Sequence, residues 1–198
     1  MAGVKELDEI GVRLVDEAGR ILTEDGPAGL SLRRLAAQAG TSTMAVYTRF
    51  GDKDGLLAAM HAEGFRRLGS ALQAAAARQP DDALESLFEM GLAYRQAALD
   101  SPHLYHLMFG EMAPSFEPDE DGRAIADAAY EPLVSGVRRA LDAGALTGGD
   151  AERIALYLWA VSHGFVSLEI SRKVEAESAE AAYRDALLLS AIPFLPRG

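Results

Sequence analysis

The sequence predicts an all-α protein, and three observations carry that prediction. Apolar residues recur at steps of three and four along almost the whole chain, which is the spacing of one helix face. β-Branched residues never gather into the alternating run that indicates a strand. Alanine and leucine, both strong helix formers, dominate the composition. We therefore expect a three-helix head at residues 1–52, a connecting helix at 53–80 and a larger helical bundle at 81–198.

The first helix is predicted to end near Glu24. The residues that follow, 25–29, include two glycines and a proline, which interrupt helices. The apolar stripe of this helix consists of Ile10, Leu14, Ala18 and Leu22.

Two short helices follow the first. Ser31 is placed to accept a hydrogen bond from a free amide at the start of a helix over 32–39, and Gly40 permits the left-handed conformation that ends it. Ser42 is placed in the same way to cap a third helix over 43–50. The chain thus predicts three helices in quick succession at its amino end.

Beyond these, a connecting helix runs from Lys53 towards Gln79 and gives way to the bundle. Two long helices with apolar faces are expected at 151–172 and 179–195. The segment 113–122 holds two prolines and four acids and is predicted to be a mobile loop.

Charge and composition narrow the class of protein. The 198 residues carry a formal net charge of -11 and no cysteine, which excludes disulfides, thiolate metal sites and a generally cationic nucleic-acid binder. The amino end is charged where an export signal would need an apolar run, and the apolar runs are too short to span a membrane. We expect a soluble, cytoplasmic protein without membrane contact.

The second and third predicted helices form a candidate helix-turn-helix, in which the second helix enters the major groove of DNA. Between Gly26 and Lys53, four cations (Arg33, Arg34, Arg49 and Lys53) face one acid, Asp52, so this segment carries about +3 within an anionic chain. The segment that would contact DNA is thus positively charged, whereas the chain as a whole is negatively charged.

A closely spaced series of residues runs through the candidate helix-turn-helix: Gly26, Ser31, Leu32, Arg33, Leu35, Ala36, Ala39, Gly40, Thr41, Ser42, Val46, Tyr47, Phe50, Lys53 and Leu56. With this series, residues 10–57 resemble the amino-terminal signature of TetR-family transcriptional regulators. One departure is Arg49, where the family usually has His or Tyr before the Phe.

The predicted DNA contacts fall into two kinds. The Tyr47 hydroxyl and the Lys53 ammonium suit phosphate oxygens, which set position. The early residues of the third helix suit base edges, and the Met44 side chain suits a thymine methyl. By resemblance Arg33 reaches the groove. The full set is Arg33, Ser42, Thr43, Met44, Tyr47, Thr48 and Lys53.

Each of these residues also has a purely structural interpretation. Tyr47 and Phe50 are equally compatible with core aromatics, since aromatic side chains usually serve packing. Arg33 is compatible with a solvated surface, and helix capping alone accounts for Ser31 and Ser42. The pattern as a whole favours DNA binding.

Trp159, His163 and Gly164 resemble the ligand-binding domain of one TetR subgroup. A ligand pocket needs an apolar cavity with a few oriented polar groups. Core packing is the alternative for each residue. Neither a cofactor nor a metal site is predicted, because His103 and His106 lack a third ligand. The candidate pocket residues are Met90, Tyr94, Tyr105, Met108, Phe109, Met112, Trp159 and His163.

The resemblance implies a homodimer, joined through its last two helices, that binds a palindromic double-stranded operator and releases it when a small-molecule effector binds. The operator, the effector and the choice between repression and activation stay open. The alternatives are a helical enzyme, which no catalytic motif supports, and a dimeric binding protein whose head no longer binds DNA.

Overall fold

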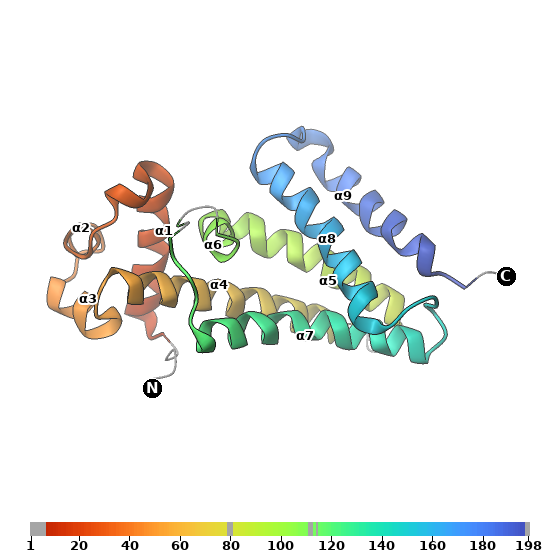
Figure 1. Cartoon of the computed structure of the whole chain (residues 1–198). Coiled ribbons are helices and arrows are strands. Elements are labelled where there is room, and N and C mark those ends of the chain that lie inside the picture. Colours follow the sequence, from red (N-terminus) through yellow and green to blue (C-terminus); the bar gives the residue numbers. More distant parts are fainter. Residues whose placement is uncertain (1–6, 79–80, 111–112, 114, 197–198) are drawn as a thin grey trace. The chain divides into compact units, whose positions relative to one another are not determined.

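The computed structural model describes residues 7–78, 81–110, 113 and 115–196 (Figure 1). These residues form nine α-helices and one 3-10 helix, with no strand among them, which confirms the all-α prediction. They divide into two compact units. Unit 1 holds the described residues of 1–66 and 101–127, and unit 2 holds those of 67–100 and 128–198.

Unit 1 is a helical head whose core is made by helices from two separate stretches of chain. Its buried cluster joins Leu14, Leu35 and Val46 to Leu104 and Leu107. A Cβ on Gly19 would lie 1.9 Å from Cδ2 of His103, so the glycine lets two helices approach closely. The helices are α1 (Glu9–Gly29), α2 (Leu32–Gln38), α3 (Thr43–Phe50), α6 (Pro102–Met108), the first part of α4 (Lys53–Ala76) and the start of α7 (Glu120–Asp142).

The regular helix at the start of α1 stops close to its predicted end near Glu24, and a second helical stretch follows within Glu9–Gly29. The interruption lies at Gly26, which is not helical and whose φ of 67° lies in the left-handed region. Glycine adopts that conformation without the steric penalty of a Cβ atom, and Pro27 then restarts a helical turn. The residues expected to interrupt the helix therefore kink it.

The predicted caps of the short helices are confirmed. The Oγ atom of Ser31 accepts from the Arg34 amide at 3.2 Å, and the Oγ atom of Ser42 accepts from the Ala45 amide at 3.1 Å. Gly40, with φ of 64°, follows α2. These caps fix where α2 and α3 begin.

Unit 2 is a bundle in which α8 packs against both α5 and α9. Tyr183 is fully buried and donates a hydrogen bond to the carbonyl of Gly91 at 2.8 Å. Arg95 pairs with Glu169 through two hydrogen bonds of 2.8 and 2.6 Å, which join α5 to α8. The helices are α5 (Ala83–Asp100), α8 (Ala151–Ile170), α9 (Ala176–Ala191), the 3-10 helix η1 (Ile192–Phe194) and the remainders of α4 and α7.

Several predicted boundaries shift. The two units do not follow the predicted segments 1–52, 53–80 and 81–198, because α4 and α7 each contribute to both units. Helix α7 begins at Glu120, inside the segment 113–122 predicted as a loop, since the Asp119 carboxylate accepts from the Gly122 amide at 2.8 Å. No described helix is both long and apolar enough to cross a membrane.

Candidate nucleic-acid interface

Helix α3 has two sides of opposite character. Val46 and Phe50 are buried in the core of unit 1. On the other side, Met44 is 73% exposed and Tyr47 is 51% exposed. Thr48 is also exposed, and its hydroxyl donates to the carbonyl of Met44 at 2.8 Å, which leaves oxygen lone pairs free to accept. The core therefore holds α3 while its polar and apolar side chains face outward.

The other predicted contact residues lie around this exposed side. Thr43, in the first turn of α3, is half-buried, and Ser42 is exposed while its hydroxyl oxygen caps the helix. Arg33 is exposed on α2, the first helix of the helix-turn-helix. The structural interpretation of Tyr47 as a core aromatic does not fit its exposure, whereas it fits Phe50.

Lys53 is held by its own chain in a way that the sequence did not predict. Its Nζ atom donates to the carbonyl of Pro27 at 2.6 Å, which connects the first turn of α4 to the bent end of α1. An ammonium group has three donors, so this bond leaves two for a phosphate. The bond holds the ammonium at a defined place at the start of α4.

Two of the four cationic residues between Gly26 and Lys53 form ion pairs with acidic residues outside that segment. Arg34 forms an ion pair with Asp25. Arg49 forms two hydrogen bonds with Asp8, at 3.0 and 2.6 Å, and a third with the carbonyl of Ala45 at 3.1 Å. The net charge of +3 for residues 26–53 therefore overstates the positive charge of the head, because Asp25 and Asp8, which pair with Arg34 and Arg49, lie outside this range.

The Asp8 carboxylate has two functions in the structure. It caps α1 by accepting a hydrogen bond from the Gly11 amide at 2.8 Å, and it forms an ion pair with the guanidinium group of Arg49 on α3. The hydrogen bond from Arg49, followed by that from the Gly11 amide, lowers the pKa of Asp8 to about 2. In return, the Asp8 carboxylate raises the pKa of Arg49. Arg49, the residue that departs from the family pattern, thus connects α3 to α1 through Asp8.

The predicted pocket residues are distributed over both units. Met90, Tyr94, Trp159 and His163 belong to unit 2, whereas Tyr105, Met108 and Phe109 belong to unit 1. Met112 lies outside the described residues. One pocket lined by the whole set stays a prediction.

In unit 2, the predicted residues form a small polar network. The Tyr94 hydroxyl accepts from Nε1 of Trp159 at 3.3 Å and is hydrogen-bonded to Nδ1 of His163 at 3.2 Å. The ring of Tyr130, which was not predicted, lies 5.5 Å from the Trp159 ring between centroids. Tyr94 is buried, so these bonds satisfy polar groups in an apolar surrounding.

In unit 1, the predicted aromatic residues continue into a cluster on α4. The centroid of the Phe109 ring lies 4.9 Å from that of Tyr105 and 5.8 Å from that of Phe65. Phe65 in turn contacts His61, with the two ring centroids 4.9 Å apart. Burial lowers the pKa of His61, and the negative charge of Asp119 opposes that change. Sequence reasoning missed His61, because a helical stripe does not distinguish a buried histidine from an exposed one.

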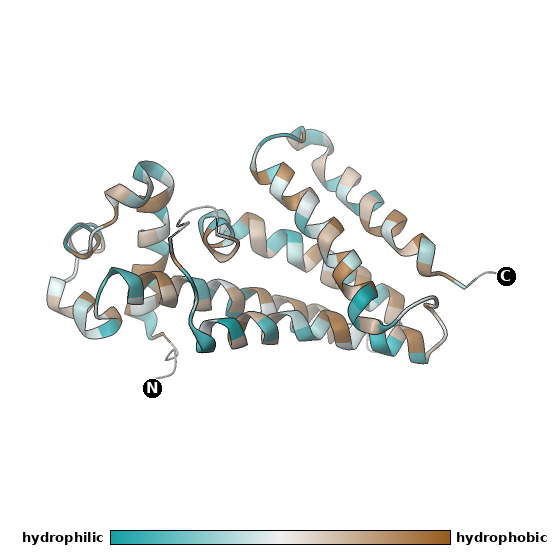
Figure 2. Ribbon diagram, in the orientation of Figure 1, coloured by the Kyte–Doolittle hydropathy of each residue, from teal (hydrophilic) through white to brown (hydrophobic). Residues whose placement is uncertain are grey.

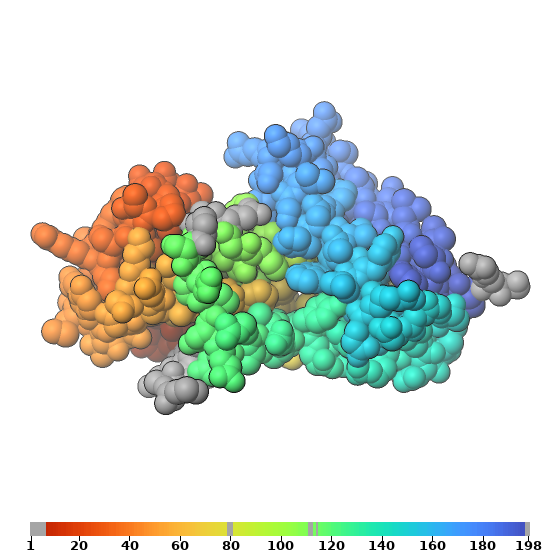
Figure 3. Space-filling view, in the orientation of Figure 1, coloured from red at the N-terminus to blue at the C-terminus, as the bar shows by residue number. Residues whose placement is uncertain are grey.

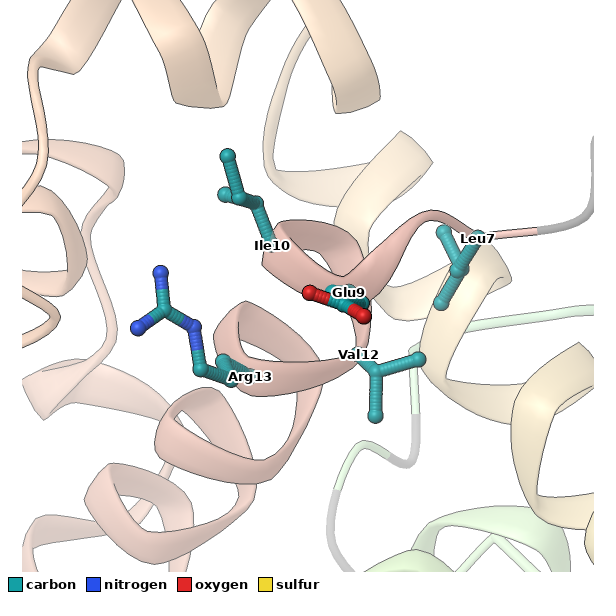
Figure 4. Close-up of a pocket in the computed structure, with 5 residues that line it drawn as sticks. All are labelled: Leu7, Glu9, Ile10, Val12 and Arg13. Atoms are coloured by element: carbon teal, nitrogen blue, oxygen red, sulfur yellow. The ribbon is translucent and has the colours of Figure 1, made fainter.

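A hollow of about 570 Å³ lies at the start of α1 (Figure 4). Ile10 and Arg13 point to one side of the helix there, and Leu7 and Val12 point to the other, with Glu9 between them. None of these residues belongs to the predicted pocket. Among the described residues, no three His, Asp or Glu side chains are grouped to hold a metal ion.

The fold and the exposed α3 define a class, the helix-turn-helix proteins with a helical carboxy-terminal domain. Residues 14–60 match the family described as bacterial regulatory proteins, tetR family, and residues 87–189 match the tetracyclin repressor-like C-terminal domain. The second match alone covers more than half of the chain. The chain belongs to the tetR family of bacterial regulatory proteins.

Several proteins of known sequence or structure are similar to this chain. HTH-type transcriptional regulators of Mycobacterium bovis (Mb1846) and Mycobacterium tuberculosis (Rv1816) are 24% identical over 140 residues, which cover 66% of this chain and 58% of each relative. A solved structure of a protein with unknown function from Rhodococcus sp. RHA1 is 30% identical, with a TM-score of 0.81 over 96% of this chain and 98% of that one. The TetR-family regulator PfmR of Thermus thermophilus, 22% identical, shares the fold, with a TM-score of 0.75 over 91% and 97% of the two chains.

Proposed function

We propose that this protein is a ligand-responsive transcriptional repressor whose paired heads bind a palindromic operator and leave it when a small molecule binds. The observation that carries the proposal is the outward side of α3, where Met44 and Tyr47 are exposed on a helix fixed by its buried side. Met44 and Tyr47 together present apolar surface on one side of α3, which a partner can cover. The major groove offers thymine methyl groups to Met44.

The DNA contacts in this proposal have separate roles. Tyr47, Ser42 and Lys53 bind phosphates and set the position of the head, and Arg33 reaches into or along the groove. Met44, Thr43 and Thr48 contact base edges and set the sequence. The exposure of Met44, Tyr47 and Thr48 on α3, and of Arg33 and Ser42 beside it, supports this division.

The homodimer interface in this proposal is formed by α8 and α9. Both helices carry exposed apolar residues, and Gly164 has no neighbouring atom within 4 Å of an added Cβ, so a partner helix has room to approach there. Figure 2 shows apolar residues along both helices, and Figure 3 shows residues of α8 at the surface of unit 2. The exposed apolar residues of α8 and α9 are Leu156, Tyr157, Leu168, Leu188 and Leu189, and Ile192 follows them at the start of η1.

Release from DNA requires an effector that binds the two states of the dimer unequally. A ligand with equal affinity for both states shifts nothing, however tightly it binds. Helix α4 is the element that carries the change in this proposal, because its first turn holds Lys53 and its later residues belong to unit 2. The proposal assigns no catalytic activity and places the protein in the cytoplasm.

Selection of bound fragments from the genomic DNA of the source organism tests the proposal. The wild type is expected to enrich an inverted repeat, and Tyr47→Ala is expected to enrich it weakly or not at all. Tyr47→Phe is the matched control, because it keeps the ring and removes only the hydroxyl. Enrichment of nothing by a folded wild type would refute operator binding and favour a dimeric binding protein.

A further inference from the structure

His61 lies on α4 within unit 1 and is only 4% exposed. Its Nδ1 atom is buried and forms no hydrogen bond with any described residue. Buried polar atoms in folded proteins nearly always have a partner, because leaving one unsatisfied destabilises the fold. Among the described residues this nitrogen is therefore a position where a bound molecule can donate or accept a hydrogen bond.

The surroundings of this nitrogen are aromatic. The ring centroids of Phe65 and Phe116 lie 4.9 and 5.8 Å from that of His61. On the side of Nδ1 lies the first turn of α7, where a Cβ added to Gly122 would be 3.6 Å from this atom. Glycine thus keeps a side chain away from the nitrogen, while the two phenylalanine rings offer faces and edges to a planar group.

The charges around His61 select the type of ligand. The burial that lowers the pKa of His61 disfavours any charged group at the same place, and the nearby Asp119 carboxylate disfavours anions further. A neutral imidazole has one nitrogen that donates and one that accepts. A hydroxyl group suits either arrangement, since it both donates and accepts.

We propose that His61, with Phe65 and Phe116, forms a binding site in unit 1 for a neutral aromatic compound that carries a hydroxyl group. The proposal rests on the proposed function in one respect, that such a compound would be the effector. His61 lies eight residues after Lys53 on the same helix, about 12 Å along its axis. A ligand held here binds inside the unit that carries the DNA-contacting residues.

The polar network of unit 2 is a weaker candidate for this role. Tyr94, Trp159 and His163 are hydrogen-bonded to one another, so their polar atoms have partners within the chain. Of the polar side-chain atoms in the described residues that are buried without a partner, Nδ1 of His61 belongs to a residue more than nine-tenths buried. We therefore place the site at Nδ1 of His61 and not at the hydrogen-bonded network of unit 2.

Titration of the full chain, labelled with ¹⁵N-histidine, with phenol tests the proposal. The Nδ1 resonance of His61 is expected to shift in a saturable way. Toluene, which has the ring without the hydroxyl, is expected to bind about tenfold more weakly, the effect of one hydrogen bond. Benzoate, an anion at pH 7, is expected to leave the resonance unchanged. An unchanged His61 resonance at saturating phenol overturns the proposal.

Three variants, whose binding of phenol and toluene is measured by calorimetry, separate the site from a general effect on folding. His61→Phe keeps an aromatic ring and is expected to lose the preference for phenol over toluene, while His61→Gln, which keeps hydrogen-bonding atoms, is expected to retain part of it. His163→Phe, in the unit 2 network, is expected to behave as the wild type. Loss of phenol binding in His163→Phe, with normal binding in a folded His61→Phe, overturns the proposal.

The proposed function has its own readout, because operator enrichment is measured without phenol. Enrichment of an inverted repeat together with an unmoved His61 resonance overturns the site alone and leaves operator binding in place. A shifted His61 resonance without operator enrichment supports the site and contradicts the repressor.

Discussion

Asp8 and Arg49 are 41 residues apart in the chain and join the start of α1 to the last turn of α3. The Asp8 side chain is 57% exposed and the Arg49 side chain 24% exposed, so screening by water and salt weakens the attraction between the two charges. The geometry is nevertheless specific, because both guanidinium donors meet both carboxylate oxygens. The pair therefore fixes the orientation of α3 more than it stabilises the whole head.

This pair predicts a pH dependence that Asp8→Asn removes. The pKa of Asp8 is about 2 in the folded state and 3.8 without its partners, so its contribution is complete above about pH 4 and disappears as the pH falls towards 2. Asparagine keeps the helix cap and loses the charge. The melting temperature of the variant is expected to lie below that of the wild type at pH 7, with a difference that shrinks below pH 4. A difference that stays constant from pH 7 to pH 3 would contradict this role.

Lys53 is expected to act through a phosphate and not through a base. Lys53→Ala should weaken binding about equally on operator and unrelated DNA, and should lower the slope of log K against log salt by about 0.9, the loss of one phosphate contact. Lys173→Ala, which removes an exposed lysine of unit 2, is the matched control and should leave the slope unchanged. Binding isotherms at several salt concentrations measure both. An unchanged slope in Lys53→Ala would refute the assignment.

The sequence predicts local features of the site well and distant ones poorly. Helical spacing places Val46 and Phe50 on one side of α3 and Met44 and Tyr47 on the other, so their burial and exposure follow from the pattern. The bond from Lys53 to the Pro27 carbonyl spans 26 residues and depends on the kink of α1. No spacing rule relates positions that only tertiary structure brings together.

At the scale of the element, α3 is a helix with one structural side and one functional side. Val46 is completely buried, so Val46→Ala is expected to destabilise the protein by about 1–3 kcal/mol through lost burial and a small cavity. Met44→Ala, on the exposed side, is expected to change stability by less than about 0.5 kcal/mol and to lower the preference for operator over unrelated DNA. Urea unfolding and competition binding measure the two effects. The reverse pattern would mean that the helix faces the other way.

Helix boundaries show why element ends are harder to predict than element types. The apolar stripe of α1 correctly indicates a helix, but the glycine and proline after it are compatible with either an end or a kink. The choice depends on whether the chain beyond the bend has an apolar surface to pack on. Leu30 and Leu32, both buried in the core of unit 1, supply that contact.

Helices α8 and α9 carry the proposed dimer interface, which a charge should disrupt. Leu189 is 63% exposed in the single chain, so Leu189→Glu is expected to leave the fold of each subunit intact. In the dimer, the carboxylate would be buried without a partner, which disfavours association strongly. Sedimentation at micromolar concentration should give a dimer for the wild type and a monomer for the variant. Ala124→Glu, exposed on α7, is the control and should stay dimeric, and a dimeric Leu189→Glu would place the interface elsewhere.

At the scale of the whole molecule, a dimer with one helix-turn-helix in each subunit binds two half-sites at a fixed separation. Both α3 helices reach the major groove of one duplex face only if the half-site centres are one helical turn, or a multiple of it, apart. An insertion of about 5 base pairs between the half-sites turns one of them to the opposite face. The wild type is then expected to bind about a hundredfold more weakly, close to its affinity for a single half-site. The Leu189→Glu monomer should bind both operators equally, since it engages one half-site at a time. Equal binding of the two operators by the wild-type dimer would show that its heads act independently, and the proposed release of DNA by a change between two states of the dimer would then have no basis.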